Sequence, residues 1–234
     1  MLIINSFDYK KDKEKKLIIL IFKRSKMTEK NTSKNNKKNK IILKILTLGD
    51  SAVGKSALLV RYTQNKFNSG YLSTVGIDYQ SKKINYQNRN IEMQIWDSAG
   101  QEKYRAISKQ YYKKANGILL LYDVTSRESF LGIKEWIRDI NNMVTMKPSL
   151  ILVGNKIDLE RKVLTEEGEE LSKKYNAMFF ETSAATGKGI EELFQALLEN
   201  IMKDYDERKK QQESLLLERL TIDGIEEKKK CCKI

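Results

Sequence analysis

From residue 41 onward, the chain alternates short apolar runs with longer stretches in which apolar residues recur at helical spacing. Strand-like runs occupy residues 41–48, 77–86, 91–97, 117–124, 149–155 and 178–184. Helical spacing covers residues 55–64, 128–144, 165–176 and 189–205, and a loop with an irregular helix covers 98–114. Alternation of this kind is typical of a mostly parallel sheet covered by helices on both faces. The pattern predicts an α/β domain with six strands, one of them antiparallel, and about five flanking helices.

The two ends of the chain lack this pattern. Residues 1–40 are rich in Lys and Asn, and their one apolar run, LIILIF, is far shorter than the roughly 20 residues that span a bilayer. We expect this arm to be disordered, with Met27 as an alternative start of the protein. The predicted domain covers residues 41–206. The helical pattern weakens after Tyr205, so residues 207–234 are predicted to form a flexible tail.

The net charge of +13 is concentrated at the ends. Residues 1–40 contribute +9 and residues 207–234 contribute +2, so the middle 166 residues carry only +2. A nucleic-acid-binding protein should carry its basic surface on the folded domain, and we therefore expect no nucleic acid as a partner. The two cysteines are adjacent near the end of the chain, where they cannot staple a fold, which suits a reducing cytosol.

The segment GDSAVGKS, residues 49–56, follows the first predicted strand and opens the first predicted helix. It fits the phosphate-loop (P-loop) pattern G-x-x-x-x-G-K-[ST]. Gly49 and Gly54 let the backbone curl round a polyphosphate, and the helix adds its positive end. Lys55 can reach the β- and γ-phosphates, and the Ser56 hydroxyl suits Mg²⁺. The motif predicts a bound nucleotide without identifying its base.

A second group of polar residues follows the third strand. Ligand sites in such sheets lie at the carboxyl ends of the strands, which is where Asp97 stands. Its carboxylate can hold the Mg²⁺ shell through a water, although an Asp at this position can also simply cap a turn. Gly100 can bring a bare backbone N–H close to a terminal phosphate. Gln101 can orient an attacking water, because its amide both donates and accepts hydrogen bonds.

The segment NKID after the fifth strand indicates which base is bound. The Asp158 carboxylate accepts hydrogen bonds only, which matches the N1–H and 2-amino donors of guanine and not adenine. We expect Asn155 to tie this loop to the phosphate loop and the Lys156 stem to lie along the base. In the later segment ETSA, the backbone of Ser183 and Ala184 can meet the guanine carbonyl. An ordinary turn remains the alternative interpretation of NKID.

Together these segments resemble the Ras superfamily of small GTPases, and more narrowly the Rab family. The resemblance covers about residues 41–204 and rests on GDSAVGKS, the Thr74 region, WDSAGQE, NKID and ETSA in this order. The narrower assignment rests on STVGIDY, EMQIW, EKYRAI, YYKKANGILLLYDVT and the final cysteine pair. It implies a P-loop NTPase fold of the small G domain type, which binds GTP or GDP with Mg²⁺ and hydrolyses GTP.

The resemblance also assigns roles to individual residues. Thr74 would be a Mg²⁺ ligand and γ-phosphate sensor beside Ser56 and Asp97, Phe67 would pack on the guanine edge, and Tyr71 would lie across the phosphates. Lys55 and Gln101 would be catalytic. The predicted nucleotide-binding residues are Gly49, Asp50, Ser51, Ala52, Val53, Gly54, Lys55, Ser56, Ala57, Phe67, Tyr71, Thr74, Gly100, Asn155, Lys156, Asp158, Ser183, Ala184 and Ala185.

Two positions depart from the family pattern. The last motif usually reads S-A-K, and here Ala185 replaces the lysine, which removes one stem beside the base and can weaken guanine binding. Ser98 stands where T-A-G is commoner, and it keeps the hydroxyl.

The terminal segment KKKCCKI predicts a membrane anchor. Cys231 and Cys232 are candidates for double geranylgeranylation, with a single prenylated C-a-a-X box as the alternative. Two lipids hold firmly where one holds weakly, and the three preceding lysines favour an anionic leaflet. The expected location is the cytoplasmic face of an intracellular membrane, in exchange with the cytosol.

The resemblance implies a set of protein partners and leaves two other functions open. The partners are effectors, an exchange factor, a GTPase-activating protein, a prenylation escort and a GDP-dissociation inhibitor, and we expect a monomer. One alternative is a hydrolysis-deficient nucleotide-binding scaffold on membranes. A P-loop kinase or ATPase is disfavoured, because NKID is present and no lid or second substrate domain is recognisable.

Overall fold

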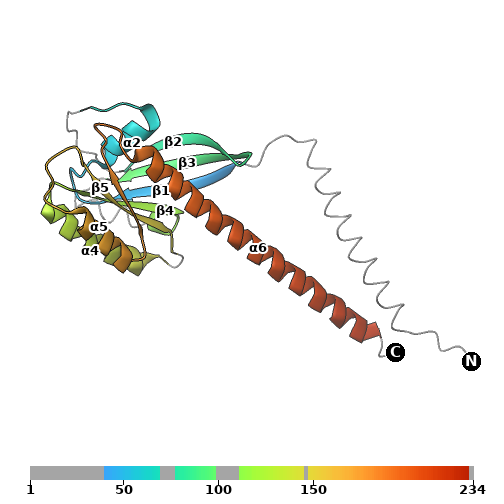
Figure 1. Cartoon of the computed structure of the whole chain (residues 1–234). Helices are drawn as coiled ribbons and strands as arrows, with labels where there is room; N and C mark the ends of the chain where they lie inside the picture. The colour runs from blue at the N-terminus through green and yellow to red at the C-terminus, as the bar shows by residue number, and fades with distance from the viewer. Residues whose placement is uncertain (1–39, 69–76, 99–110, 145–146, 232–234) are drawn as a thin grey trace, which may run out of the picture.

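A computed structural model gives the fold, and it describes residues 40–68, 77–98, 111–144 and 147–231 (Figure 1). Its centre is a six-stranded sheet in the order β2-β3-β1-β4-β5-β6. The strands are β1 (Ile41–Leu48), β2 (Ile77–Tyr86), β3 (Arg89–Ser98), β4 (Gly117–Asp123), β5 (Ser149–Asn155) and β6 (Met178–Thr182). Only the β2–β3 pair is antiparallel. The predicted α/β fold with a six-stranded, mostly parallel sheet is therefore confirmed.

Helices cover both faces of this sheet (Figure 1). The described residues contain α2 (Lys55–Gln64), α4 (Arg127–Met143), α5 (Thr165–Lys174) and α6 (Ile190–Cys231). Side chains of α2 and α6 pack on one face, and side chains of α4 and α5 pack on the other. Most of the irregular helix predicted over residues 98–114 lies outside the described residues.

Alternation along the central strands builds the two halves of the core. On β1, Leu43 and Ile45 join the cluster beneath α2 and α6, whereas Leu46 and Leu48 join the cluster beneath α4 and α5. Successive side chains of a strand point to opposite faces, so a strand buried on both sides is apolar throughout. This explains why the apolar runs alone predicted β1, β4 and β5.

The parallel register brings the polar residues of the motifs to one edge of the sheet. Thr47 of β1 lies opposite Asp97 of β3, and Asn155 of β5 lies opposite Asp123 and Thr182 on its two neighbours. The carboxyl ends of five strands therefore meet at the edge where the phosphate loop begins.

The start of α5 differs from the prediction. Thr165, followed by Glu166 and Glu167, has the sequence pattern of an N-cap with an acidic first turn, but the helix already begins at Thr165 and Leu164 takes the capping position. The Leu164 N–H donates to the Glu167 carboxylate over 3.1 Å. The Thr165 hydroxyl instead donates to Glu181 over 3.2 Å and accepts from Arg161 over 2.6 Å. A tertiary hydrogen-bond network has taken the side chain that local capping would have used.

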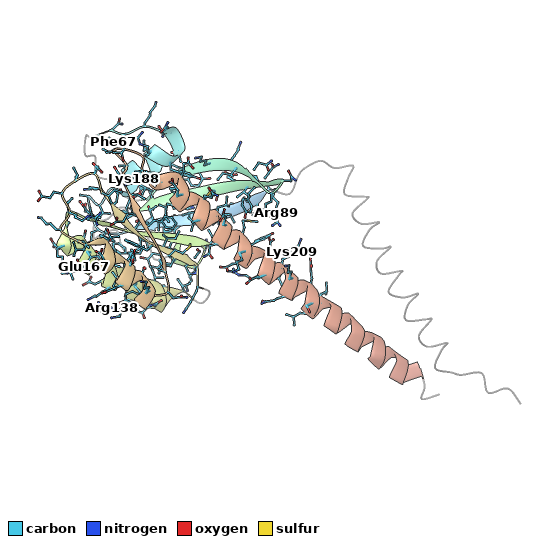
Figure 2. The ribbon with its side chains drawn as sticks, in the orientation of Figure 1. Phe67, Arg89, Arg138, Glu167, Lys188 and Lys209 are labelled. Carbon is cyan, nitrogen blue, oxygen red and sulfur yellow. The ribbon has the colours of Figure 1, made fainter. Side chains whose placement is uncertain are left out.

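The end of α6 also differs from the prediction, because the helix continues as one element from Ile190 to Cys231. Beyond the sheet, ion pairs one turn apart join Arg208 to Asp204 over 3.8 Å and Lys209 to Glu213 over 3.9 Å. Such pairs, in a segment rich in Glu, Gln, Lys and Arg, support an exposed helix. Figure 2 shows Lys209 on this outer part of α6. Whether residues 207–234 behave as a flexible tail stays a prediction.

None of the helices in the described ranges has the length and apolar character needed to cross a bilayer.

Candidate nucleotide-binding site

The phosphate loop connects β1 to α2 and depends on two glycines. Gly49 and Gly54 have φ angles of 136° and 96°, in the region that favours glycine. A Cβ at Gly49 would lie 2.2 Å from the Leu121 carbonyl oxygen, and one at Gly54 would lie 2.4 Å from Nδ2 of Asn155. The loop can therefore follow this path only where neither residue has a side chain.

Lys55 points back into the loop that precedes it. Its Nζ donates to the carbonyl oxygens of Gly49 over 2.9 Å and Asp50 over 2.7 Å, and the residue is only 6% exposed. Burial lowers the pKa of Lys55 to about 8, and the nearby Asp97 and Asp50 carboxylates partly offset this effect. The ammonium group thus lies inside the concave loop. A polyphosphate bound there would supply negative charge, which favours the protonated form of this buried lysine.

The oxygen atoms expected to hold Mg²⁺ lie together next to this lysine. Ser56 donates a hydrogen bond to Oδ2 of the buried Asp97, and Thr47 donates to Oδ1 of the same carboxylate over 3.1 Å. The described residues contain no group of three His, Cys, Asp or Glu side chains able to hold a metal ion. Mg²⁺ commonly keeps several waters and binds one or two protein oxygens plus phosphate, so this donor set fits it.

Ser98 uses its hydroxyl inside the protein. Its Oγ donates to the Thr47 carbonyl oxygen over 2.6 Å, and the side chain is buried. The departure from the family pattern at Ser98 therefore keeps the hydrogen bond between the ends of β1 and β3.

A contact that sequence reasoning missed supports the phosphate loop from α4. Nε1 of the buried Trp136 donates to Oδ1 of Asp50 over 2.8 Å. A Cβ at Gly132 would lie 2.6 Å from the other carboxylate oxygen, so a glycine makes room for Asp50 on the helix surface. Trp136 fitted the apolar spacing of α4, and nothing in the sequence identified its partner.

The loop after β5 is connected to the phosphate loop as expected. Nδ2 of Asn155 donates to the Val53 carbonyl oxygen over 2.9 Å, while Oδ1 accepts from the Thr182 hydroxyl over 3.1 Å. Asn155 is 1% exposed and joins three segments. Lys156 has a φ angle of 70° and pairs with Asp123 over 2.6 Å, a partner that the sequence did not indicate.

The carboxylate expected to recognise guanine is held by the loop after β6. Ser183 Oγ donates to Oδ1 of Asp158 over 2.6 Å, and Asp158 is exposed at the surface. A second interaction joins the segment after β5 to β6, because Arg161 pairs with Glu181 over 3.0 Å. The structure therefore brings Asp158, Ser183 and Ala184 into neighbouring loops.

Several predicted site residues lie near the limits of the described part of the chain or outside it. Phe67 is 40% exposed, and the Arg61 guanidinium lies 6.0 Å from its ring centre. Cys231 is the last described residue and ends α6. The predicted residues outside the described part of the chain are Tyr71, Thr74, Gly100, Gln101 and Cys232.

Three aromatic rings form a continuous row beside the site. Tyr79 of β2 contacts Trp96 of β3 at a centroid distance of 5.0 Å, and Trp96 contacts Tyr111 at 4.9 Å. Tyr79 is 41% exposed. A cavity of about 170 Å³ adjoins this row, and its lining consists of Lys44, Ile45, Leu46, Trp96, Tyr111, Lys114 and Ala115. The row is a candidate surface for a protein partner, since aromatic side chains are enriched at interfaces.

Comparisons with known proteins give a consistent result. The model of the Ras family matches residues 44–203. Ras-related protein SEC4 of Saccharomyces cerevisiae is 41% identical over 179 residues, covering 76% of this chain and 83% of that protein. Human Ras-related protein Rab-15 is 42% identical over 165 residues, covering 70% and 78%. Ras-related protein RAB1BV of Beta vulgaris is 40% identical over 199 residues, covering 82% and 93%.

Proposed function

The chain belongs to the Ras family, in its Rab group of small GTPases, and from this we propose that it is a Mg²⁺-dependent GTP/GDP switch on an intracellular membrane. Its relatives support a role in vesicle traffic. We further propose which residues bind the nucleotide, that GTP hydrolysis is slow, and that lipids anchor the chain to the membrane.

The observation that carries the proposal is the pair of hydrogen bonds made by Asn155. One joins it to Val53 in the phosphate loop, and the other joins it to Thr182 beside the base loop. A buried amide in this position fixes the separation between a site for phosphates and a site for a purine. A nucleoside polyphosphate would occupy both sites at once, whereas few other ligands would need both.

At the phosphate end, backbone N–H groups and Lys55 would hold the β- and γ-phosphates. Ser56 would contact Mg²⁺ directly, and Asp97 would hold the metal's water shell. Thr74 would complete this set by the family resemblance. When bound, Mg²⁺ neutralises charge on the phosphates. The mutual hydrogen bonds of Ser56, Asp97 and Thr47 support this assignment, because they hold the oxygen donors in place.

Hydrolysis would depend on Gln101 orienting a water, with Gly100 contacting the γ-phosphate. The motifs contain no arginine placed to neutralise the transferring phosphoryl group. Intrinsic hydrolysis should therefore be slow, and an arginine from a GTPase-activating protein can add roughly 10³- to 10⁵-fold. The expected exchange factor would restore the GTP-bound state by releasing GDP, so that GTP can bind.

Effector proteins would bind where Tyr79, Trp96 and Tyr111 form the aromatic row. Tyr79 belongs to segment 67–79 and Tyr111 to segment 98–112, the two segments that would respond to the γ-phosphate, and Trp96 lies on β3 between them. Prenyl groups on Cys231 and Cys232 would anchor the chain to the cytoplasmic face of a membrane. A prenylation escort and a GDP-dissociation inhibitor would handle the lipidated form in the cytosol.

The direct test is to identify the nucleotide that copurifies with the full chain and then to measure phosphate release with and without Mg²⁺. We expect GDP or GTP, Mg²⁺-dependent release, and affinity for guanine far above that for adenine nucleotides. Gln101→Leu should keep GTP bound but unhydrolysed. Equal affinity for ATP and GTP would overturn the proposal, and absence of release from the unmutated chain, even with added activating protein, would favour the scaffold.

The anchoring part is tested separately in cells. The variant Cys231→Ser with Cys232→Ser should move to the cytosol and retain GTP binding, while deletion of residues 1–26 should change little. The charges of the arm alone give a salt-screened attraction. Retention of the double variant on membranes would assign the anchor to another segment or to a protein partner.

A further inference from the structure

Arg61 in the last turn of α2 contacts a loop that is far away in sequence. Its Nε donates to the Ala184 carbonyl oxygen over 2.8 Å, and its Nη2 donates to the Ala185 carbonyl oxygen over 2.7 Å. The planar fork of an arginine suits two adjacent acceptors. One side chain thus holds two consecutive peptide groups of the loop that follows β6.

The same guanidinium also reaches the end of its own helix. Nη1 lies 3.3 Å from the Asn65 carbonyl oxygen, and the group faces the Phe67 ring at 6.0 Å. The Arg61 stem lies next to Gly187, where a Cβ would be at an ordinary contact distance of 3.8 Å from Cδ of Arg61. Figure 2 labels Phe67 and Lys188 at the same end of the domain, where these contacts gather.

One of the two held peptide groups directs its N–H away from Arg61 and toward no partner in the described part of the chain. In a trans peptide the C=O and N–H bonds point in opposite directions. The Ala184 carbonyl points toward Arg61, so the Ala185 N–H points away from it. The N–H of the second held peptide belongs to Thr186 and donates to Ser183 Oγ over 3.0 Å. In the described part of the chain, the Ala185 N–H makes no hydrogen bond. Backbone N–H groups are strong donors, and the Ala185 N–H is therefore available to a ligand acceptor.

Two separate supports hold this loop. On one side, Ser183 donates to Asp158, the carboxylate expected to bind the N1–H and 2-amino groups of guanine. On the other side, Arg61 holds the Ala184–Ala185 peptide, whose N–H would meet the guanine O6. The loop lacks the lysine that usually follows S-A, because Ala185 takes its place. In the described residues, Arg61 is the only arginine or lysine side chain that donates a hydrogen bond to the Ala184 and Ala185 carbonyls.

We propose that Arg61 is a positioning residue for guanine specificity, which orients the N–H of the Ala184–Ala185 peptide toward the O6 carbonyl of the base. The inference rests on the proposed function. It assigns recognition of O6 to a tie from α2 and recognition of the 2-amino group to Asp158. The two contacts should therefore be separable by mutation.

The experiment measures dissociation constants of the full chain for three nucleotides with Mg²⁺. GDP presents both contacts, IDP lacks the 2-amino group, and 6-thio-GDP replaces O6 by a poorer acceptor. The variants are Arg61→Ala and Arg61→Lys, and the control is Arg138→Ala, which removes an exposed arginine from α4. Thermal melting of each variant establishes that it is folded.

Arg61→Ala should weaken GDP binding by about tenfold, the effect expected for loss of a charge-assisted hydrogen bond. It should weaken 6-thio-GDP binding much less, so the preference for GDP over 6-thio-GDP should collapse. The preference for GDP over IDP should remain. Arg61→Lys should be intermediate, because an ammonium group replaces only part of the fork, and Arg138→Ala should resemble the parent.

Equal weakening of all three nucleotides by Arg61→Ala would overturn the inference, because it would show a general structural role. An unchanged ratio of GDP to 6-thio-GDP affinity in Arg61→Lys would also overturn it, and this result is available even if Arg61→Ala does not fold. Failure of the parent chain to bind GDP at all would instead overturn the proposed function.

Discussion

The two halves of the candidate site are built in different ways. The phosphate half consists of the contiguous residues 49–56, and its shape depends on backbone angles at Gly49 and Gly54. The base half collects residues from the loops after β5 and β6 and from the last turn of α2, and its shape depends on side-chain hydrogen bonds.

The difference predicts how each half should fail. Where the backbone itself forms the site, a wrong side chain strains the chain and should affect folding and binding together. Where side chains hold separate loops, the loss of one hydrogen bond should leave the fold intact and change which base is bound. Asn155 joins the two halves, so its loss should combine both effects.

The largest expected effect is from Gly49→Ala. The new Cβ would lie 2.2 Å from a main-chain oxygen on the neighbouring strand, at a φ angle of 136°. We expect the unfolding free energy to fall by about 3 kcal/mol, measured by denaturant unfolding. GDP binding should be lost as well, measured by nucleotide titration. Gly187→Ala is the matched control, since its φ is also positive but its Cβ would meet only the Arg61 stem at 3.8 Å, and it should cost about 1 kcal/mol. Similar losses for the two variants would contradict a backbone-built phosphate half.

The second effect is a change of base. In Asp158→Asn, one acceptor oxygen becomes an NH₂ group that faces a guanine donor. Polar recognition of this kind can discriminate by about 10⁴-fold, and we expect that preference to move from guanine toward xanthine nucleotides. The fold should stay stable, as checked by thermal melting. Glu160→Gln changes a neighbouring exposed charge and should keep the parent's preference. Unchanged guanine preference in Asp158→Asn would remove this carboxylate from the base site.

The third effect tests the connection between the halves. Asn155→Ala leaves the Val53 carbonyl and the Thr182 hydroxyl without their partner. We expect a loss of about 2 kcal/mol in unfolding free energy and a decrease of roughly 10- to 100-fold in GDP affinity. Thr182→Val removes only the second bond and should have the smaller effect on both measurements. Equal effects would mean that the bond to the phosphate loop contributes little.

The smallest effect is the pH dependence of the phosphate half. In the nucleotide-free protein, burial lowers the pKa of Lys55 to about 8, and the unfolded value is near 10.5. Between these values the unfolded chain binds more protons, so through this group the nucleotide-free protein gains stability as pH rises. Bound phosphates favour the protonated lysine, so GDP affinity should fall by about fourfold between pH 7 and pH 8.5.

This dependence should appear as proton uptake on GDP binding at pH 8.5, measured by calorimetry in buffers with different ionisation enthalpies. Lys55→Arg carries a charge that does not titrate in this range and should lose the pH dependence, even if it binds less tightly. A parent protein that takes up no proton would show that Lys55 is already charged before the nucleotide binds.

The sequence by itself determined the parts of this protein that are encoded locally. Apolar runs of strand length predicted β1, β4 and β5, because a strand buried on both faces must be apolar throughout. The phosphate loop was also recognisable, since its function needs glycines and a lysine at fixed spacing within one short segment. Asn155 was expected to contact that loop, because both stand at the carboxyl ends of parallel strands.

Only the tertiary structure decided contacts between residues that are far apart in the chain. Trp136 read as a core residue of α4, and its indole N–H proved to hold Asp50. Thr165 has the pattern of a helix cap, but its hydroxyl instead accepts a hydrogen bond from Arg161 and donates one to Glu181. Nothing in the sequence indicated that Arg61 of α2 would hold the loop after β6. Periodicity reports which face of an element is buried, whereas the partner of a polar group depends on the packing of whole elements, which no local pattern contains.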